Sequence, residues 1–142
     1  MNKLYICMST VLLLLVLVGI SMAESFTTLP DGLEYKDLKV GNGREAQLGD
    51  TAVIHFVGWL DENGHRGEEI YNSRKERNSV SFVIGTDKVM QGWNEGVIGM
   101  RAGGTRLLRI PPGLGYGEKG VEDVVPQNAH LQFIIELLEV RK

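Results

Sequence analysis

Apolar and β-branched residues gather in short runs along most of the chain, separated by glycine, proline and charged residues. Runs of this length and composition predict β-strands. The clearest runs lie at 33–40, 51–60, 80–84, 105–110 and 130–140. The charged stretch 66–78 interrupts the pattern and is interpreted as a strand followed by a surface excursion. The whole pattern predicts a sheet of about five strands.

The run 51–60 is nearly continuously apolar, so we expect it to be a central strand buried on both faces. The residues that follow it, 61–64, end in Asn63-Gly64. This dipeptide supplies the positive φ angles of a tight hairpin turn. Short connections of this kind indicate that the sheet is antiparallel.

One short helix is expected between the runs 80–84 and 105–110. Either Thr86 or Asp87 has a side-chain oxygen that can cap its first backbone N–H groups. Helical spacing then places three apolar side chains on one face: Val89, Trp93 and Val97. Such a stripe is typical of core packing. A helix this short does not cover a sheet, however, so the large ring of Trp93 could also form the floor of a pocket.

The predicted fold class is therefore α+β, with an antiparallel five-stranded sheet wrapped around one short α-helix. A long stretch rich in glycine and proline, 112–129, joins the last two strands. Loops of this length without regular structure are usually functional. We expect a pocket between the helix, one face of the sheet and this loop.

Residues 1–23 have the parts of a secretory signal peptide, with Lys3, an aliphatic run at 11–20 and small residues before position 24. The apolar run is shorter than the roughly 20 residues of a membrane span, and an uncleaved anchor is the alternative interpretation. Residues 24–31 are expected to be a polar linker outside the fold, and 32–142 a single domain. This organisation predicts a secreted, secretory-lumen or periplasmic protein.

Composition argues against several classes of function. Cys7, the only cysteine, lies in the leader, so the mature chain has no thiol for catalysis or disulfides. The net charge of −3, without a basic block, argues against a nucleic-acid partner. No membrane contact is expected after signal cleavage. His55, His65 and His130 lack metal-ligand spacing, and His55 is expected to be hydrogen-bonded within the sheet. We therefore expect neither a metal nor a cofactor.

The stretch 115–120 fits the pattern G-x-G-x-x-G, but it follows Pro111-Pro112 and does not open a helix. A dinucleotide site requires a strand before this pattern and a helix after it, so none is expected. What remains is an apolar, aromatic site in which only one side chain carries a hydroxyl. Its members are Phe56, Val89, Met90, Trp93, Tyr116 and Phe133.

Several separated motifs resemble those of the FKBP family of peptidyl-prolyl cis–trans isomerases, in the same order and with similar spacing. They are Val53-Ile54-His55-Phe56-Val57-Gly58, Val89-Met90-Gln91-Gly92-Trp93, Ile110-Pro111-Pro112, Leu114-Gly115-Tyr116-Gly117 and Leu131-Gln132-Phe133. The resemblance runs from about Gly32 to Val140. It implies a curved antiparallel sheet around one helix, and it implies isomerisation of X–Pro peptide bonds.

The resemblance also implies the residues of the site. The implied catalytic residues are Tyr116, Trp93, Phe56 and Phe133, and the binding positions add Val80, Phe82, Val89, Met90, Val121, Val124 and Val125. By resemblance, Trp93 is expected to form the floor of a proline pocket. The backbone N–H of Met90 and the hydroxyl of Tyr116 are expected to hold carbonyl oxygens of a substrate or drug. The implied ligands are proline-containing polypeptides and macrolides of the tacrolimus and rapamycin type.

The chain departs from the family's pattern after the predicted hairpin. Where the family has an aromatic residue followed by aspartate, this chain has Ile70-Tyr71-Asn72. One alignment places Ile70 at the aromatic position and Tyr71 at the aspartate, and the other places Tyr71 and Asn72 there. In either case the pocket carboxylate is missing. In the family this carboxylate accepts a hydrogen bond from the ligand, so its absence affects the expected macrolide affinity more than the expected binding of proline segments.

These observations predict a monomeric prolyl isomerase that assists protein folding. The alternative is a module that binds proline segments or macrolides without catalysis. The missing carboxylate favours the binding module, whereas the retained Tyr116, Trp93 and apolar walls favour the enzyme.

Overall fold

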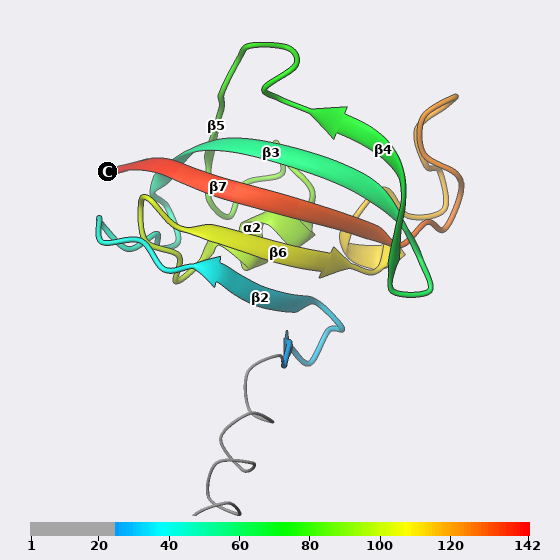
Figure 1. Ribbon diagram of the computed structural model, residues 1–142, viewed down its shortest axis with the longest axis horizontal. Helices are drawn as coiled ribbons and strands as arrows, with labels where there is room; N and C mark the ends of the chain where they lie inside the picture. Colours follow the sequence, from blue (N-terminus) through cyan, green and yellow to red (C-terminus); the bar gives the residue numbers. More distant parts are fainter. Residues whose placement is uncertain (1–24) are drawn as a thin grey trace, which may run out of the picture.

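The computed structural model describes residues 25–142, and the expected signal peptide at 1–23 lies outside them. A single antiparallel sheet dominates the described residues (Figure 1). Its strands are β1 (Thr27–Thr28), β2 (Glu34–Lys39), β3 (Thr51–Glu62), β4 (His65–Asn72), β5 (Val80–Val83), β6 (Thr105–Ile110) and β7 (Leu131–Arg141). They are arranged in the order β1-β2-β6-β7-β3-β4, and β5 pairs with the other half of β3. The helices are α2 (Gln91–Val97) and a 3-10 turn at Pro112–Leu114.

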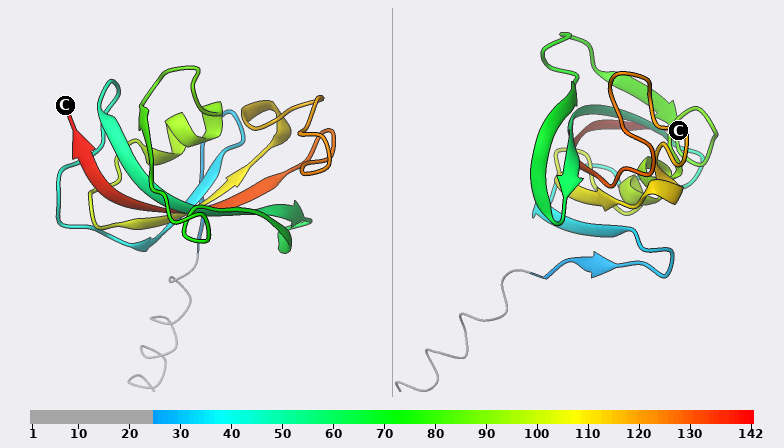
Figure 2. Two further views of the ribbon diagram at one scale, coloured as in Figure 1. Left: turned by 90° about the horizontal axis from the view of Figure 1, so that it is seen from above. Right: turned by 90° about the vertical axis from the view of Figure 1, so that its right-hand side faces the viewer.

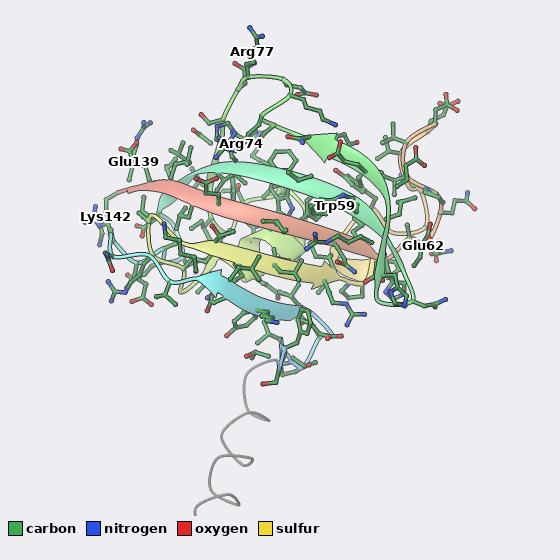
Figure 3. All side chains as sticks on the ribbon, in the orientation of Figure 1. Trp59, Glu62, Arg74, Arg77, Glu139 and Lys142 are labelled. Carbon is green, nitrogen blue, oxygen red and sulfur yellow. The ribbon has the colours of Figure 1, made fainter. Side chains whose placement is uncertain are left out.

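The fold class predicted from the sequence is confirmed, because the antiparallel sheet curves around one short α-helix (Figure 2). The sheet has seven strands, however, and not five. The charged stretch after His65 does form a strand, β4, before the surface excursion; Figure 3 shows Arg77 at the tip of that excursion. Part of the expected linker also joins the sheet, since Thr27 and Thr28 pair with Tyr35 and Glu34. The interpretation of 24–31 as lying outside the fold is therefore wrong for these residues.

Strands β3 and β7 form the centre of the sheet. Their register places Phe56 opposite Ile135 and Gly58 opposite Phe133. The β3–β4 turn is the predicted hairpin, with positive φ angles of 55° at Asn63 and 89° at Gly64. Gly58 has a close-packing role, because a Cβ at this position would lie 2.4 Å from the ring of Phe133. The absence of a side chain at Gly58 therefore lets the buried ring of Phe133 pack against the backbone of β3.

Helix α2 begins at Gln91, four to five residues after the predicted start, and Met90 stands at its N-cap without a side-chain cap. The Thr86 hydroxyl does not cap the helix, because it donates to the Val83 carbonyl. Asn94 explains the late start. Its buried side chain accepts from the Gly85 N–H at 2.8 Å and donates to the Thr86 carbonyl at 2.7 Å. These bonds hold the preceding segment as a turn, which the helical spacing of the sequence does not reveal.

The hydrophobic core lies between α2 and the concave face of the sheet, on the side where the 112–129 loop also lies (Figure 2). Gly96 allows the helix to approach β6, since a Cβ there would lie 2.4 Å from Leu108. Arg106 of β6 is 6% exposed and donates to the carbonyls of Gly96 and Ile98, at the end of the helix. Asp37 of β2 pairs with the same guanidinium at 2.8 Å. The residues from 25 onward include no helix that is long and apolar enough to cross a bilayer.

Candidate active site

Trp93, a residue of α2, lies at the centre of a cluster of aromatic side chains. Its ring centroid lies 4.6 Å from that of Phe56 and 5.3 Å from that of Phe133, both in edge-to-face geometry. Phe82 lies 5.9 Å away in a tilted orientation. Trp93 is 7% exposed, and its indole nitrogen Nε1 is buried without a hydrogen-bond partner within residues 25–142. The cluster thus combines an apolar surface with one unused donor.

The sequence-predicted aromatic residues fall into two groups by burial. Phe82 and Phe133 are 5% and 0% exposed, so they pack against the ring of Trp93 within the core and do not line a surface. Phe56 is half-buried and lies beside Trp93. The other expected site residues that are half-buried and packed against the same core are Ile70, Val80, Val89, Met90, Tyr116 and Val121. A ligand can therefore contact these residues, Phe56 and the small exposed part of Trp93.

Ser73 fixes the backbone that carries Phe56, and the sequence analysis did not identify it. Its hydroxyl accepts from the Phe56 N–H at 2.8 Å and donates to the Phe56 carbonyl at 3.2 Å. His55 Nδ1 lies 2.8 Å from the same hydroxyl, which confirms the expectation that this histidine is hydrogen-bonded within the sheet. The only signal in the sequence is a serine just after a strand, which is too common to be informative.

Tyr116, at the start of the long loop, contributes the hydroxyl of the site. Its ring lies 6.4 Å from that of Tyr71 on β4. Burial, together with the neighbouring Tyr71, raises the pKa of Tyr116 to about 12. The hydroxyl therefore remains protonated, and able to donate a hydrogen bond, throughout the neutral pH range.

Of the residues in the two alternative alignments, Tyr71 is the one beside Tyr116. Ile70 packs against the core, whereas the Asn72 side chain bonds outside the site, to Glu69 at 3.4 Å and to the backbone N–H of Arg74 at 3.1 Å. The position beside the Tyr116 hydroxyl is thus occupied by a second phenol and not by a carboxylate.

Met90, at the N-terminus of α2, presents backbone groups at the edge of the cluster. Its carbonyl accepts from the N–H groups of Trp93, at 3.1 Å, and Asn94, at 3.4 Å. Its own N–H has no backbone acceptor within residues 25–142. A backbone donor is therefore available next to Val89 and Trp93.

The long loop is closed by a tight turn in which the Val121 N–H donates to the Val125 carbonyl at 2.9 Å and the reverse bond measures 2.8 Å. Val125 is 4% exposed and belongs to the core, whereas Val124 is 37% exposed. The two valines expected to close over a ligand thus have different surroundings. A cavity of about 510 Å³ lies beside this turn and includes Val121, Val124 and Val125 in its lining.

The sequence and the fold are similar to those of known proteins. A family model described as FKBP-type peptidyl-prolyl cis-trans isomerase matches residues 42–138. The chain is 41% identical over 109 residues to an FK506-binding protein of Neisseria meningitidis serogroup B, a match that covers 77% of this chain and 96% of that protein. It is 37% identical over 123 residues to peptidyl-prolyl cis-trans isomerase FKBP53 of Arabidopsis thaliana, covering 85% of this chain and 25% of the relative.

Among solved structures, FkpA from Escherichia coli matches with a TM-score of 0.73 and 34% identity, over 87% of this chain and 55% of that chain. The chain therefore spans nearly the whole of the Neisseria protein, about half of FkpA and a quarter of the Arabidopsis relative.

Proposed function

Because the chain belongs to the FKBP-type peptidyl-prolyl cis–trans isomerase family, we propose that it accelerates rotation about X–Pro peptide bonds in client polypeptides. The observation that carries this proposal is the aromatic surface formed by the half-buried Phe56 and Tyr116 and the nearly buried Trp93, with two donors at its edge: the Tyr116 hydroxyl and the Met90 N–H. Such a site fits an apolar ring flanked by carbonyl oxygens, which describes a proline and its neighbouring peptide bonds.

The chemistry of the reaction requires no nucleophile and no proton transfer. Rotation faces a barrier of about 18–20 kcal/mol because the amide loses its resonance at the twisted midpoint. Without catalysis the exchange takes roughly 10–100 s. The twisted amide is less charge-separated than the planar one, so an apolar surface that excludes water favours it. Hydrogen bonds formed best in the twisted geometry lower the barrier further.

In this proposal each part of the site has a separate task. Trp93 and Phe56 receive the proline ring, since they present the apolar surface. The Met90 N–H and the Tyr116 hydroxyl hold carbonyl oxygens on either side of the rotating bond and keep the flanking chain in position. Phe82 and Phe133 act indirectly, because they are buried and fix the orientation of Trp93.

Changing Tyr116→Phe is expected to lower kcat/KM for a Leu-Pro peptide by about 2- to 10-fold, the value of one net hydrogen bond. Exchange between the cis and trans forms can be followed by NMR. Because the pKa of Tyr116 is raised to about 12, the wild-type rate should stay constant through the neutral range. Tyr35→Phe is the matched control, since it removes a hydroxyl from a half-buried tyrosine on β2. Equal rates in the two variants would show that the Tyr116 hydroxyl has no role in the reaction. A folded wild-type protein that does not accelerate the exchange would refute the proposed isomerase activity.

A second candidate is a module that binds proline segments or macrolides without catalysis, and the pair Tyr71–Tyr116 is the observation that favours it. The family resemblance places a carboxylate in this region as an acceptor for a drug hydroxyl. Here the partner of Tyr116 is a phenol, which is a weaker acceptor than a carboxylate. We propose that affinity for macrolides is reduced for this reason.

Tyr71→Asp is expected to raise affinity for rapamycin by about 10- to 100-fold, because a charged acceptor makes the stronger hydrogen bond. Calorimetric titration measures the dissociation constant. Tyr71→Asn is the control, since it has the same size as the aspartate but no charge. If the asparagine variant binds as tightly as the aspartate variant, relief of crowding by the tyrosine is the cause and the carboxylate has no role.

For the cellular setting we propose secretion or residence in a secretory or periplasmic lumen. The support is the amino-acid pattern at 1–23, with its positive start, aliphatic run and small residues before position 24. Comparison of the N-terminal residue of the protein isolated from its source with Glu24 tests this proposal.

A further inference from the structure

A cavity of about 510 Å³ lies between the hairpin of β3 and β4 and the loop 119–127. Its apolar walls come from Leu60, Val121, Val124, Val125 and Pro126. Its charged side chains are Glu68, Lys119, Glu122 and Asp123. The cavity thus combines an apolar interior with ionisable groups, and it is large enough for a side chain of a bound polypeptide.

The lining carries a net negative charge, since it includes three carboxylates and one ammonium group. Within the described part of the chain, none of these four side chains takes part in an ion pair. Their charges are therefore not neutralised by neighbours in the fold. A concave site lined by uncompensated carboxylates attracts a cationic group and repels an anionic one.

The register of β4 connects this cavity to the aromatic site. Tyr71 is opposite Gly58 on β3, and Glu69 is opposite Trp59, so Ile70 forms a bulge. Side chains that are opposite each other in a register point to the same face, and successive residues alternate. A second register shift, between Trp59 and Asp61, leaves Glu68 beside Leu60, with which it lines the cavity. Leu60 is on the same face of β3 as Gly58, the partner of Tyr71, so Glu68 and Tyr71 share a face. The two residues are three positions apart, so at roughly 3.3 Å per residue they lie at most about 10 Å apart along the strand.

The loop that forms the other wall is fixed relative to Tyr116. The Asn128 N–H donates to the Gly117 carbonyl at 2.9 Å, and the Gly120 N–H donates to the Tyr116 carbonyl at 3.2 Å. The Val121–Val125 turn closes the loop between these bonds. Glu122 and Asp123, within this turn, are thus held at a fixed place beside the aromatic site.

We propose that this cavity binds a lysine or arginine side chain of the client, within about three residues of the prolyl bond. The inference rests on the proposed isomerase function and adds to it a class of substrate: proline segments with a basic flank. The long methylene stem of either residue packs on the valines and Leu60, while its charged end meets the carboxylates. A client with an acidic residue at the same position is disfavoured.

The test uses peptides that contain one proline and differ at a single site, which is lysine, glutamine or glutamate at each of three positions on either side. NMR measures both the exchange rate and the dissociation constant of each peptide with the purified protein. At low salt we expect kcat/KM to be about tenfold higher for the best lysine peptide than for its glutamate counterpart, the low end of what a charged cleft contributes. The difference should shrink at high salt.

The triple variant Glu68→Gln, Glu122→Gln, Asp123→Asn should reduce this ratio to about one. The asparagine is chosen because Asp123 has a positive φ of 62°, which asparagine tolerates. A matched control, Glu45→Gln with Glu136→Gln and Glu139→Gln, changes the net charge equally at exposed ion pairs outside the cavity lining. It should keep the lysine preference.

The outcomes separate this inference from the proposed function. Equal rates and affinities for lysine and glutamate peptides, with clear acceleration of both, overturn the cavity assignment and leave the isomerase standing. A lysine preference that survives in the triple variant also overturns it. If no peptide is accelerated, the isomerase is refuted, and the dissociation constants still decide whether the cavity selects basic side chains.

Discussion

Replacing Trp93 with alanine is expected to lower the free energy of unfolding by about 3–5 kcal/mol and to abolish prolyl isomerisation. The side chain is 7% exposed and touches the rings of Phe56, Phe82 and Phe133. Removing it leaves a cavity between the helix and the sheet that surrounding rings cannot fill without moving. Phe56, which packs edge-on against Trp93, loses its orientation at the same time.

Urea unfolding followed by far-UV circular dichroism measures the loss of stability. Trp59→Ala is the natural control, because Trp59 is the only other tryptophan and is only half-buried on β3. Its recorded partner is the guanidinium of Arg66, 4.5 Å from the ring centroid, an interaction of about 0.5–1 kcal/mol at an exposed site. If both variants unfolded at the same urea concentration, Trp93 would not be the centre of the core.

Replacing Arg106 with methionine is expected to lower the free energy of unfolding by about 2–4 kcal/mol, although methionine nearly conserves the length of the side chain. The guanidinium donates to the Gly96 and Ile98 carbonyls, and without it these acceptors at the end of α2 are left unpaired. Asp37 also loses its bidentate partner, with bonds of 2.8 and 3.2 Å. Because α2 carries Trp93, we expect KM for prolyl peptides to rise as well.

Arg109→Met, on the same strand, is the comparison for this variant. The Arg109 side chain is 30% exposed and pairs with Glu34 and Asp61 at 3.3 and 3.2 Å. The pair with Glu34, whose side chain is 31% exposed, contributes about 0–1 kcal/mol. The Asp61 side chain is 5% exposed, but without Arg109 it still accepts a hydrogen bond from the Gly64 N–H at 2.6 Å. Thermal and urea unfolding of the two variants should therefore differ clearly. Equal losses would mean that the bonds to the helix carbonyls do not determine the effect of Arg106.

Both predictions concern how the site is held in place. The aromatic surface that a proline would contact is contributed mainly by Trp93 of α2 and Phe56 of β3. Buried polar groups make the connection. Asn94 joins the helix to the turn at Gly85, and Arg106 joins its end to β6 and β2. In a site without a nucleophile, accurate placement of an apolar surface is the main contribution that the fold makes to the reaction.

Several features could be predicted from the sequence because they depend on local pattern. Strand β6 begins and ends where the alternation of apolar residues predicts, at Thr105 and Ile110. The hairpin at 61–64 follows from Asn63-Gly64, since this dipeptide adopts positive φ angles at low cost. The aromatic members of the site were identified by their type and by the family resemblance, and the structure gathers Phe56, Phe82 and Phe133 around the ring of Trp93.

Other features were determined by contacts between residues far apart in the chain. The start of α2 is set by Asn94, whose side chain bonds to the backbone nine residues earlier. Strand β1 consists of two residues that have no apolar pattern of their own and are ordered by pairing with β2. Arg106 looks like an exposed charge in the sequence, yet it is buried because Asp37, 69 residues away, and the end of α2 meet it.

The sequence by itself thus determined every strand except β1, the turn and the chemical character of the site, because hydrophobic period and turn preference act over a few residues. Only the tertiary structure decided which aromatic rings are exposed, where the helix begins and which charges line the cavity between the β3–β4 hairpin and the loop 119–127. The physical reason is that burial and the pairing of polar groups depend on neighbours in space, and for this fold those neighbours come from distant strands.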